Sequence, residues 1–255
     1  MSVFEVTDLS IAYDATEDAD GATPRLDGIS LRLDAGRIYD LTGPSGAGKS
    51  MLLRACAQLM TIKGGSLTLD GVDSSTFSYQ EWRRHVCLVP QHASLIRGTI
   101  RDNLLLPWTL KVNRGTQVPP DDELRELLQA AQLDVPLDRD AAKLSGGQAA
   151  RVALLRAFAT KPRVLLLDEV DAALDDVSAQ AVGELTVQIV GRDATCLRIR
   201  HRPPDGKASS TFHLEGGHLT VLGMRSDMAP REMEPTDPVE ASTPRDAAQP
   251  SGGEA

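Results

Sequence analysis

The chain has 255 residues, a length that fits one large domain or one domain followed by a tail. Hydrophobic residues make up 41% and charged residues 25%, so the chain can build a globular core, mainly from aliphatic side chains because aromatic residues reach only 4%. The formal net charge of −9 argues against broad electrostatic capture of nucleic acid, and no apolar run approaches the roughly 20 residues that a membrane-spanning helix needs.

The first part of the chain alternates between strand patterns and loops. Residues 3–11 and 26–33 alternate apolar and polar side chains, which predicts two half-buried strands. The acidic stretch between them, residues 14–24, contains Gly and Pro and predicts a loop. Residues 37–42 predict a further strand, in which Asp40 needs a partner if its carboxylate is buried.

The second part of the chain favours helices around one buried strand. Residues 121–131 place leucine side chains on one helical face behind two acids that favour a helix start. Residues 164–167 form a continuous apolar run, typical of a strand buried on both faces of a parallel sheet. Residues 178–190 again have helical spacing. Residues 224–255 combine recurring Pro with polar and acidic side chains, which predicts a disordered tail.

The cysteines and the N-terminus bear on the compartment. Cys56, Cys87 and Cys196 are odd in number, far apart, and without His at metal-ligand spacing. We therefore expect three buried, reduced thiols rather than disulfides or a zinc site. The N-terminus contains Glu5 and Asp8 and lacks the basic-then-apolar order of a signal peptide. These observations fit a cytoplasmic protein.

Residues 43–50, Gly-Pro-Ser-Gly-Ala-Gly-Lys-Ser, match the phosphate-binding pattern G-x-x-x-x-G-K-S/T in full. The glycines let backbone N–H groups approach phosphate oxygens, Lys49 supplies a charge for the β- and γ-phosphates, and the Ser50 hydroxyl is suited to ligate Mg²⁺. The strong helix formers of residues 51–59 would add the positive end of a helix. The alternative is a chance Gly-rich turn. The predicted nucleotide-binding residues of this loop are Gly43, Pro44, Ser45, Gly46, Ala47, Gly48, Lys49, Ser50 and Met51.

Asp168 and Glu169 end the apolar run of residues 164–167. The carboxyl end of a parallel strand is where α/β sheets place their chemistry. After a phosphate loop, we expect Asp168 to hold Mg²⁺ through water and Glu169 to polarise the attacking water. The alternative for such a pair is the capping of a helix by acids at the end of a strand.

Residues 144–148, Leu-Ser-Gly-Gly-Gln, precede a predicted helix over residues 149–160. Ser145 is suited to cap this helix, and such a helix start offers free N–H groups and a hydroxyl to an anion. A Gly-rich turn before a helix would explain Ser-Gly-Gly alone. It does not explain the position of this segment between the phosphate loop and the acid pair.

In this order the three motifs resemble the nucleotide-binding subunits of ABC transporters, over roughly residues 3–222. The resemblance implies an α/β P-loop NTPase of the ABC ATPase type, with a mixed or parallel sheet core, an N-terminal antiparallel β-subdomain and a helical subdomain at about residues 92–160. It further implies that residues 1–223 form the ATPase domain and that residues 224–255 are a disordered tail.

The resemblance also implies that the ligands are ATP and Mg²⁺ and that the working form is a dimer. In the family, two chains sandwich two ATP molecules head to tail. The residues that would complete the ATP site of the opposite subunit are Ser145, Gly146, Gly147 and Gln148. Because each chain has one copy of every motif, the implied dimer is a homodimer.

Four further residues match the family one at a time. Tyr13 lies where the family keeps an aromatic that stacks on adenine, but a lone Tyr also suits the edge of a strand. Gln91 matches the glutamine that touches Mg²⁺ and water, and Asp175 matches the polar residue of a loop that crosses the dimer interface. His201 matches the switch histidine near the γ-phosphate; the alternative is a surface histidine. The resemblance implies catalytic roles for Glu169, His201, Gln91 and Lys49, and a metal site at Ser50, Gln91 and Asp168.

Three residues depart from the family pattern. Met51 replaces a second hydroxyl after the Lys-Ser pair, and Ala172 replaces the usual Ser of the interface loop. Arg200 stands before His201 where a small hydroxyl residue is usual. None of these changes removes a residue expected in catalysis, so we expect hydrolysis to survive them.

Residues 98–104, Gly-Thr-Ile-Arg-Asp-Asn-Leu, resemble exporter-type subunits, and together with Pro107 and Trp108 they look most like the bacterial iron-export ATPase family, FetA. The alternative is an apolar helix face that meets some other permease. The resemblance implies a separate transmembrane permease, a cytoplasmic chain held at the inner face of the cell membrane through that permease, and no nucleic-acid partner. A second hypothesis is a soluble ABC ATPase in a non-transport role.

Overall fold

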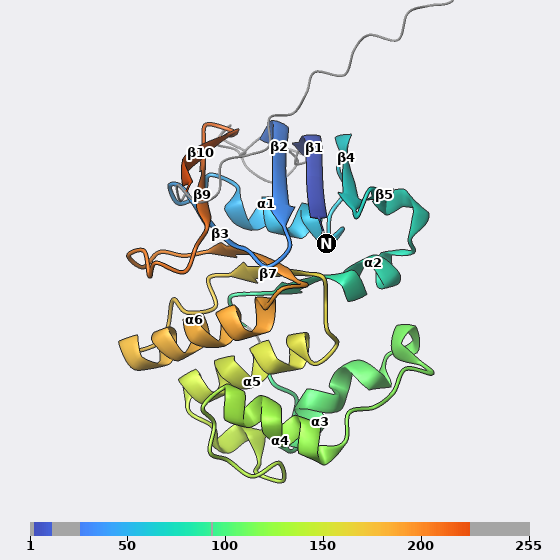
Figure 1. Ribbon diagram of the computed structural model, residues 1–255, viewed down its shortest axis with the longest axis vertical. Helices are drawn as coiled ribbons and strands as arrows, with labels where there is room; N and C mark the ends of the chain where they lie inside the picture. Colours follow the sequence, from blue (N-terminus) through green and yellow to red (C-terminus); the bar gives the residue numbers. More distant parts are fainter. Residues whose placement is uncertain (1–2, 12–25, 93, 225–255) are drawn as a thin grey trace, which may run out of the picture.

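A computed structural model of the protein describes residues 3–11, 26–92 and 94–224, in which two sheets and a layer of helices are stacked (Figure 1). A smaller antiparallel sheet lies at one end, the larger sheet lies in the middle, and most of the helices lie at the other end. This arrangement confirms the predicted α/β fold class. In the described residues, no helix is long and apolar enough to cross a membrane.

The smaller sheet has four strands in the order β2-β1-β4-β5, all antiparallel to their neighbours. The strands are β1 (Val3–Ile11), β2 (Leu26–Asp34), β4 (Gly64–Leu69) and β5 (Val72–Asp73). Along β1, Phe4 and Val6 are buried while Thr7 is exposed, as expected of a sheet with one face in the core. The two predicted N-terminal strands are confirmed.

The larger sheet has six strands in the order β10-β9-β3-β8-β7-β6. The strands are β3 (Ile38–Thr42), β6 (Val86–Val89), β7 (Val164–Asp168), β8 (Thr195–Ile199), β9 (Ser210–Glu215) and β10 (His218–Met224). All neighbouring pairs are parallel except β9 and β10. Every residue of β7 is buried, which confirms the predicted strand with both faces covered.

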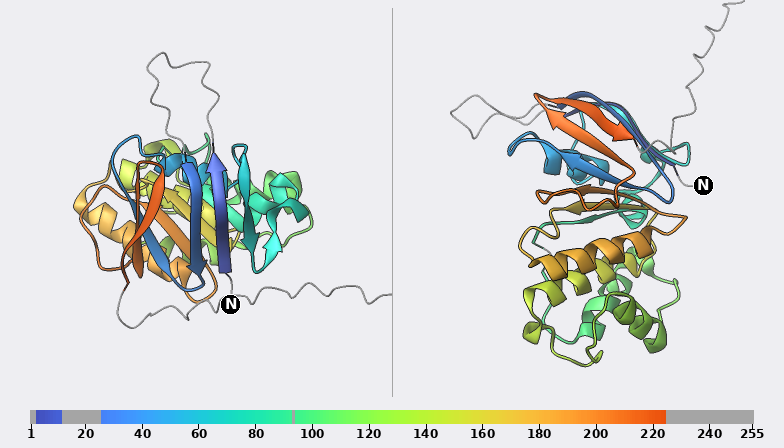
Figure 2. Two further views of the ribbon diagram at one scale, coloured as in Figure 1. Left: turned by 90° about the horizontal axis from the view of Figure 1, so that it is seen from above. Right: turned by 60° about the vertical axis from the view of Figure 1, so that its left-hand side comes forward.

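Helices cover both faces of the larger sheet (Figures 1 and 2). Between the two sheets lies α1 (Lys49–Cys56), and the opposite face is covered by α5 (Gly146–Phe158) and α6 (Asp176–Val190). Farther from the sheet lie α3 (Ile100–Leu105) and α4 (Asp121–Ala130). The remaining helix, α2 (Tyr79–His85), leads into β6. The helix predicted over residues 121–131 is confirmed, with its start at Asp121.

Buried side chains form two clusters, one on each face of the larger sheet. The first fills the space between the sheets around α1 and includes the fully buried Trp82, whose indole N–H donates to the carbonyl of Cys56 at 2.8 Å. The second joins the larger sheet to α3, α4, α5 and α6. Strand β7 contributes Leu166 to the first cluster and Leu165 and Leu167 to the second, as the alternation of side chains along a strand requires.

Side-chain caps fix where the two long helices begin. Ser145 caps α5 and forms a capping box with Gln148, and Asp175 caps α6 by accepting from the backbone N–H of Ser178. Both helices therefore begin immediately after their caps, earlier than the starts predicted at residues 149 and 178. The periodicity missed these first turns because they contain residues of low helix propensity, which a cap tolerates.

The cysteines are free, as expected, but they are not equally buried. Cys56 and Cys196 are buried, and burial raises the pKa of each thiol to about 12. Cys87 is partly exposed, because it lies on β6 at the edge of the sheet, and burial raises its pKa to about 11. The expectation of three buried thiols is thus wrong for Cys87, although none of the three is a reactive thiolate at neutral pH.

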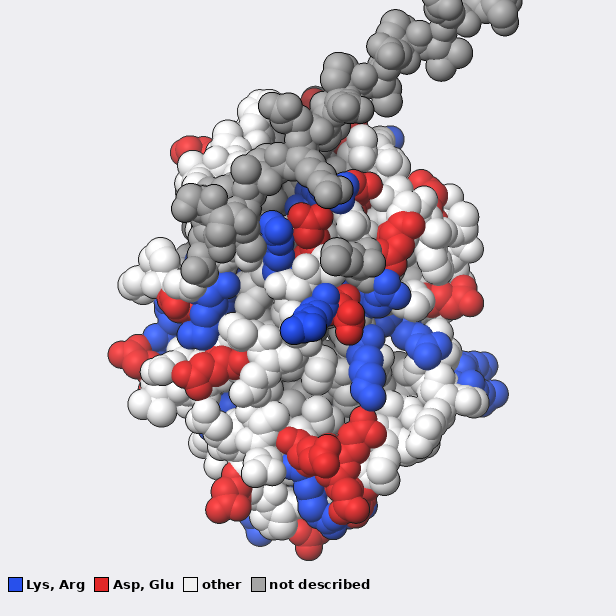
Figure 3. Space-filling view, in the orientation of Figure 1, with Lys and Arg blue, Asp and Glu red and all other residues white. Residues whose placement is uncertain are grey.

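Acidic and basic side chains are interspersed over the face of the molecule shown in Figure 3. Acidic side chains gather at the lower end of this view, and basic side chains lie above them on the right. Neither sign forms a broad field across this face.

Candidate nucleotide site

The phosphate loop connects the end of β3 to the start of α1. Gly43 has a φ of 141°, and a Cβ atom there would lie 2.1 Å from the carbonyl oxygen of Leu214 on β9. Any side chain at this position would collide with the backbone of the neighbouring strand, so glycine is required. Gly48, at the N-cap of α1, leaves the first helical turn without a side-chain cap. The free N–H groups of such a turn are suited to bind a phosphate.

The Lys49 side chain folds back over the phosphate loop. Its Nζ donates to the carbonyl of Gly43 at 2.8 Å and to that of Pro44 at 2.9 Å, and only 5% of the residue is exposed. An ammonium group has three N–H donors, so a third donor is available for a further oxygen. The loop carbonyls therefore hold a buried positive charge beside the backbone N–H groups of α1.

Ser50 and Asp168 meet at the carboxyl end of β7. The Ser50 hydroxyl donates to Asp168 Oδ1 at 2.9 Å. Hydroxyl and carboxylate oxygens are the hard ligands that Mg²⁺ prefers, usually one or two of them together with water and substrate phosphates. Among the residues that the structure describes, no group of three or more His, Cys, Asp and Glu side chains could hold a metal ion. The Ser50–Asp168 pair supplies the two kinds of oxygen ligand that suit Mg²⁺.

The Glu169 carboxylate lies between Gln91 and His201. The Gln91 amide donates to Glu169 Oε2 at 2.8 Å, and His201 Nε2 lies 2.7 Å from Oε1. The Glu169 side chain is 19% exposed and that of His201 is 49% exposed, so the carboxylate is shielded while the imidazole remains open to solvent. Three segments that are far apart in the sequence thus converge on one carboxylate.

The starts of α5 and α6 are packed against each other. A Cβ atom on Gly147 would lie 2.4 Å from Ser178 Oγ, and the same hydroxyl donates to Asp175 Oδ2 at 3.0 Å. The hydrogen bond from the backbone N–H of Ser178 also holds the pKa of the Asp175 carboxyl below its ordinary value. The Ser145–Gln148 segment and Asp175 are therefore neighbours in the fold.

The predicted site residues form two groups in the structure. The phosphate loop, Asp168 and Glu169, with Gln91 and His201, make up the first group. The Ser145–Gln148 segment and Asp175 make up the second group. Within the described part of the chain, no hydrogen bond or ion pair joins a residue of the first group to a residue of the second. Tyr13 lies outside the described residues, as do the predicted loop of residues 14–24 and the tail beyond residue 224.

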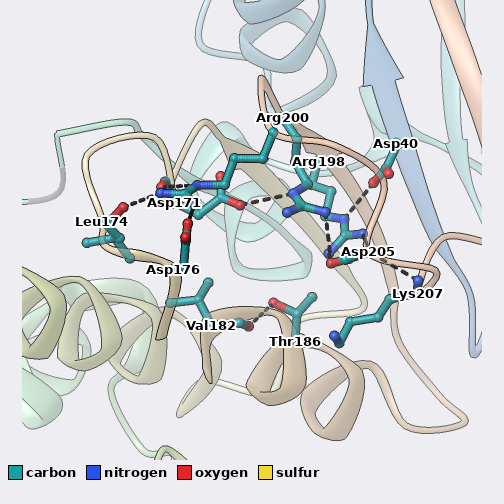
Figure 4. A network of polar contacts seen from close by, with 11 residues as sticks. Asp40, Asp171, Leu174, Asp176, Val182, Thr186, Arg198, Arg200, Asp205 and Lys207 are labelled. Atoms are coloured by element: carbon teal, nitrogen blue, oxygen red, sulfur yellow. Dashed lines mark hydrogen bonds and ion pairs between the residues drawn. The ribbon is translucent and has the colours of Figure 1, made fainter. Parts of the chain in front are cut away.

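Four charged residues that lie close in sequence to Glu169 or His201 belong to none of the motifs, and three of them are labelled in Figure 4. They are Asp171, Arg198, Arg202 and Asp205. Arg202, for example, donates to Asp176 at 2.6 Å and also to the carbonyl of Leu174. In the sequence, the signal for this arrangement is an arginine at every second position, 198, 200 and 202.

Comparison with known proteins relates the chain to the ABC transporter family. The family model described as "ABC transporter" matches residues 26–172. The methionine import ATP-binding protein MetN 1 of Pseudomonas savastanoi pv. phaseolicola is 38% identical over 170 residues, which cover 65% of this chain and 50% of that protein. The probable iron export ATP-binding protein FetA of Escherichia coli (strain K12) is 38% identical over 160 residues, which cover 63% of this chain and 70% of that protein.

A solved structure gives the same result for the fold. A bacterial Atm1-family ABC exporter with ATP bound superposes with a TM-score of 0.70 and 25% identity, over 86% of this chain and 38% of that chain. The chain spans about half the length of several curated relatives that it matches. Its match to the family model covers more than half of its own residues. The chain therefore belongs to the ABC transporter family and carries an ATP-binding ATPase domain of that family.

Proposed function

We propose that this chain binds and hydrolyses ATP as the nucleotide-binding subunit of an ABC transporter and drives a separate membrane permease. The observation that supports this most strongly is the Glu169 carboxylate, which is held at both oxygens next to the Ser50–Asp168 pair. An acid oriented by hydrogen bonds beside a phosphate loop is suited to act on a water molecule.

In the proposed reaction, the Glu169 carboxylate orients a water molecule and takes up its proton while the water oxygen bonds to the γ-phosphorus. The bond from the γ-phosphorus to the bridging oxygen breaks, and ADP and phosphate are the products. Lys49 and the backbone N–H groups of the phosphate loop stabilise the charge on the phosphate oxygens. We assign Gln91 to the water and His201 to the γ-phosphate. When bound at Ser50, Gln91 and Asp168, Mg²⁺ would neutralise part of the phosphate charge.

The separation of the two groups of site residues supports a dimer as the working form. Residues 145–148 and Asp175 lie at the starts of α5 and α6, which cover the face of the larger sheet opposite α1. In the proposed homodimer, they face the ATP that is bound to the phosphate loop of the second chain. The capped start of α5 would then contribute N–H groups and a hydroxyl to that ATP.

The test of the proposed reaction is Glu169→Gln. We expect turnover of ATP to fall by about 100-fold or more, because the amide cannot accept the proton, while ATP binding is retained. ATP should then convert the variant from monomer to dimer in size-exclusion chromatography with light scattering. The matched control is Glu126→Gln on the exposed face of α4, which should hydrolyse ATP as the wild type does. Unchanged turnover in Glu169→Gln would remove this residue from the mechanism.

The substrate and the partner are finer parts of the same proposal. We propose a separate permease, a position at the cytoplasmic face of the cell membrane through that permease, and metal export, with iron as the first substrate to test. The exporter-like stretch of residues 98–104 and the similarity to FetA support this choice. The equal identity to MetN 1 makes an importer the competing outcome. Vesicles that contain the permease and this chain should move ferrous iron out of the ATP-exposed side.

The alternative function is a soluble ABC ATPase in a non-transport role. Co-expression with the membrane protein encoded by the neighbouring reading frame separates the two functions. Co-purification with that protein, with ATP turnover that changes on binding, supports the transport role. A chain that turns over ATP equally well alone and binds no such neighbour would support the alternative.

We also propose the domain division that the sequence predicts. Residues 1–223 would form the ATPase domain, with a helical subdomain at about residues 92–160, and the tail would follow. The second buried cluster supports the subdomain, because α3, α4 and α5 share it. β10 ends at Met224, so the proposed boundary falls one residue before the end of the last described strand.

A further inference from the structure

A network of buried charged side chains includes Arg200, the residue directly before His201 in the sequence (Figure 4). Arg198 donates to Asp40 Oδ1 at 2.6 Å and to both oxygens of Asp205 at 2.7 and 3.0 Å. Arg200 Nε donates to Asp171 Oδ2 at 2.9 Å. A second nitrogen of Arg200 lies 2.8 Å from Asp205, as an ion pair without the geometry of a hydrogen bond. The five side chains are between 5% and 18% exposed, so the charges depend on one another for compensation.

The Arg200–Asp171 contact joins the same two segments as the His201–Glu169 contact. Arg200 directly precedes His201, and Asp171 lies two residues after Glu169. The His201–Glu169 contact is solvent-accessible, with the imidazole 49% exposed, whereas the Arg200 and Asp171 side chains are 10% and 7% exposed. The segments are therefore tied twice, once at the surface and once in the interior.

The interior contact continues towards Asp175. The backbone N–H of Ala172 donates to the carbonyl of Glu169 at 3.1 Å, and that of Leu174 donates to the carbonyl of Asp171 at 3.3 Å. These bonds close the segment from Glu169 to Leu174 into turns, directly before the Asp175 cap of α6. A displacement of Asp171 would thus move both ends of the segment.

Position 200 is also one of the three departures from the family pattern, where a small hydroxyl residue is usual. A serine there would be too short to reach Asp171 and would leave that buried carboxylate without its guanidinium. Removal of one partner of a buried ion pair leaves an uncompensated charge, whereas removal of both partners does not. Single and double substitutions can therefore separate two effects: the loss of stability from an uncompensated charge, and the displacement of the segment that Asp171 belongs to.

We propose that Arg200 is a positioning residue for ATP hydrolysis: by holding Asp171, it fixes the segment of residues 169–175 relative to His201 and so aims Glu169 at the attacking water. The inference rests on the proposed ATPase function. In this inference Arg200 does not contact ATP. Its substitution should therefore lower kcat and leave ATP binding unchanged. Misplacement of reacting groups by about 1 Å can cost about 100-fold in rate.

The test compares four forms of the full chain: wild type, Arg200→Ser, Asp171→Ser and the double variant Arg200→Ser/Asp171→Ser. For each form, kcat and KM for ATP are measured together with the thermal unfolding midpoint. We expect Arg200→Ser to lose about tenfold or more in kcat, with KM within about twofold of wild type. The unfolding midpoint of the double variant should return most of the way to that of wild type, because the uncompensated Asp171 carboxylate is no longer buried. Its kcat should stay low, because nothing holds residues 169–175 in place.

The matched control is Asp40→Asn, which weakens the same network at its far end on β3, away from residues 169–175. This variant should lower the unfolding midpoint and leave kcat within about twofold of wild type. If the double variant regains kcat together with its midpoint, or if Asp40→Asn loses kcat as Arg200→Ser does, the network is only structural and the inference is wrong. An inactive wild type that also fails to bind ATP would instead contradict the proposed function.

Discussion

Glu169 has a φ of 50°, a left-handed backbone conformation that costs a residue other than glycine on the order of 1 kcal/mol. It is the first residue after β7, so this conformation ends the strand abruptly. The turn bond from Ala172 to Glu169 and the contacts with Gln91 and His201 surround the residue. Strain that is held by several partners is common where a side chain must be aimed.

Asp205 gives the buried network a pH dependence. Burial alone would raise the pKa of this carboxyl, but hydrogen bonds from Arg198 and from the backbone N–H of Lys207 outweigh burial and hold the pKa below 3.8. Between this lowered value and 3.8, the unfolded chain binds more protons than the folded chain, so the free energy of unfolding rises with pH. The contribution is fully present above pH 3.8 and is lost as the pH falls through the folded-state pKa.

We therefore expect Asp205→Asn to be less stable than wild type at about pH 7, and the difference to shrink as the pH falls below 3.8. Urea unfolding of both proteins across this range measures the difference in the free energy of unfolding. A difference that stays constant down to the lowest pH would show that Asp205 titrates alike in the folded and unfolded chains.

At the level of elements, the close packing of the starts of α5 and α6 makes a prediction about Gly147. A methyl group there would press on Ser178 Oγ and disturb the Asp175 cap. We expect Gly147→Ala to lower the free energy of unfolding by about 1–3 kcal/mol, as overpacking does. Urea denaturation measures this change.

Gly146 supplies the control for this prediction. A Cβ atom on Gly146 meets nothing within 4 Å, and alanine favours a helix more than glycine does. Gly146→Ala should therefore leave the free energy of unfolding unchanged or raise it slightly. Equal losses in the two variants would mean that the helix start, and not the contact with Ser178, is responsible.

The elements differ in how far the sequence could predict them. The apolar run of residues 164–167 was sufficient to predict β7, because a strand buried on both faces is apolar along its whole length, whichever strands pair with it. The starts of α5 and α6 were placed too late, because caps and not periodicity decide them. The Arg200–Asp171 contact could not be predicted, since its partners are 29 positions apart and no periodic pattern relates them. Asp40 was expected to need a partner, and Arg198 is that partner.

The candidate site was predictable as residue types and not as contacts. Sequence patterns indicated Ser50, Asp168 and Glu169, and the family resemblance added Gln91 and His201. The structure brings these five residues into two contacting sets. Their roles in catalysis stay predictions, as does the role of Tyr13. The sequence could not predict which residues come into contact when the chain folds. The hydrogen bond between Gln91 and Glu169, which are 78 positions apart, is an example.

At the scale of the whole molecule, the last strand sets a limit for truncation. We expect a chain that ends at Met224 to retain the ATP turnover and the unfolding midpoint of the full chain, because β10 is then complete. A chain that ends at Gly217 should be less stable, because β9 loses its antiparallel partner. Steady-state turnover and thermal unfolding of both truncations measure these outcomes. A large loss of turnover on removal of residues 225–255 alone would show that these residues act in catalysis.

The packing of Gly43 against Leu214 has a consequence for the order of events during synthesis. β3 pairs with β8 and β9, and Tyr39 stacks on Phe212 at a centroid distance of 5.6 Å. A nascent chain that has left the ribosome only as far as β7 therefore has every residue of the phosphate loop but neither strand that flanks it. The loop can take its final shape only when the last part of the domain emerges, so competence to bind nucleotide arises late in translation.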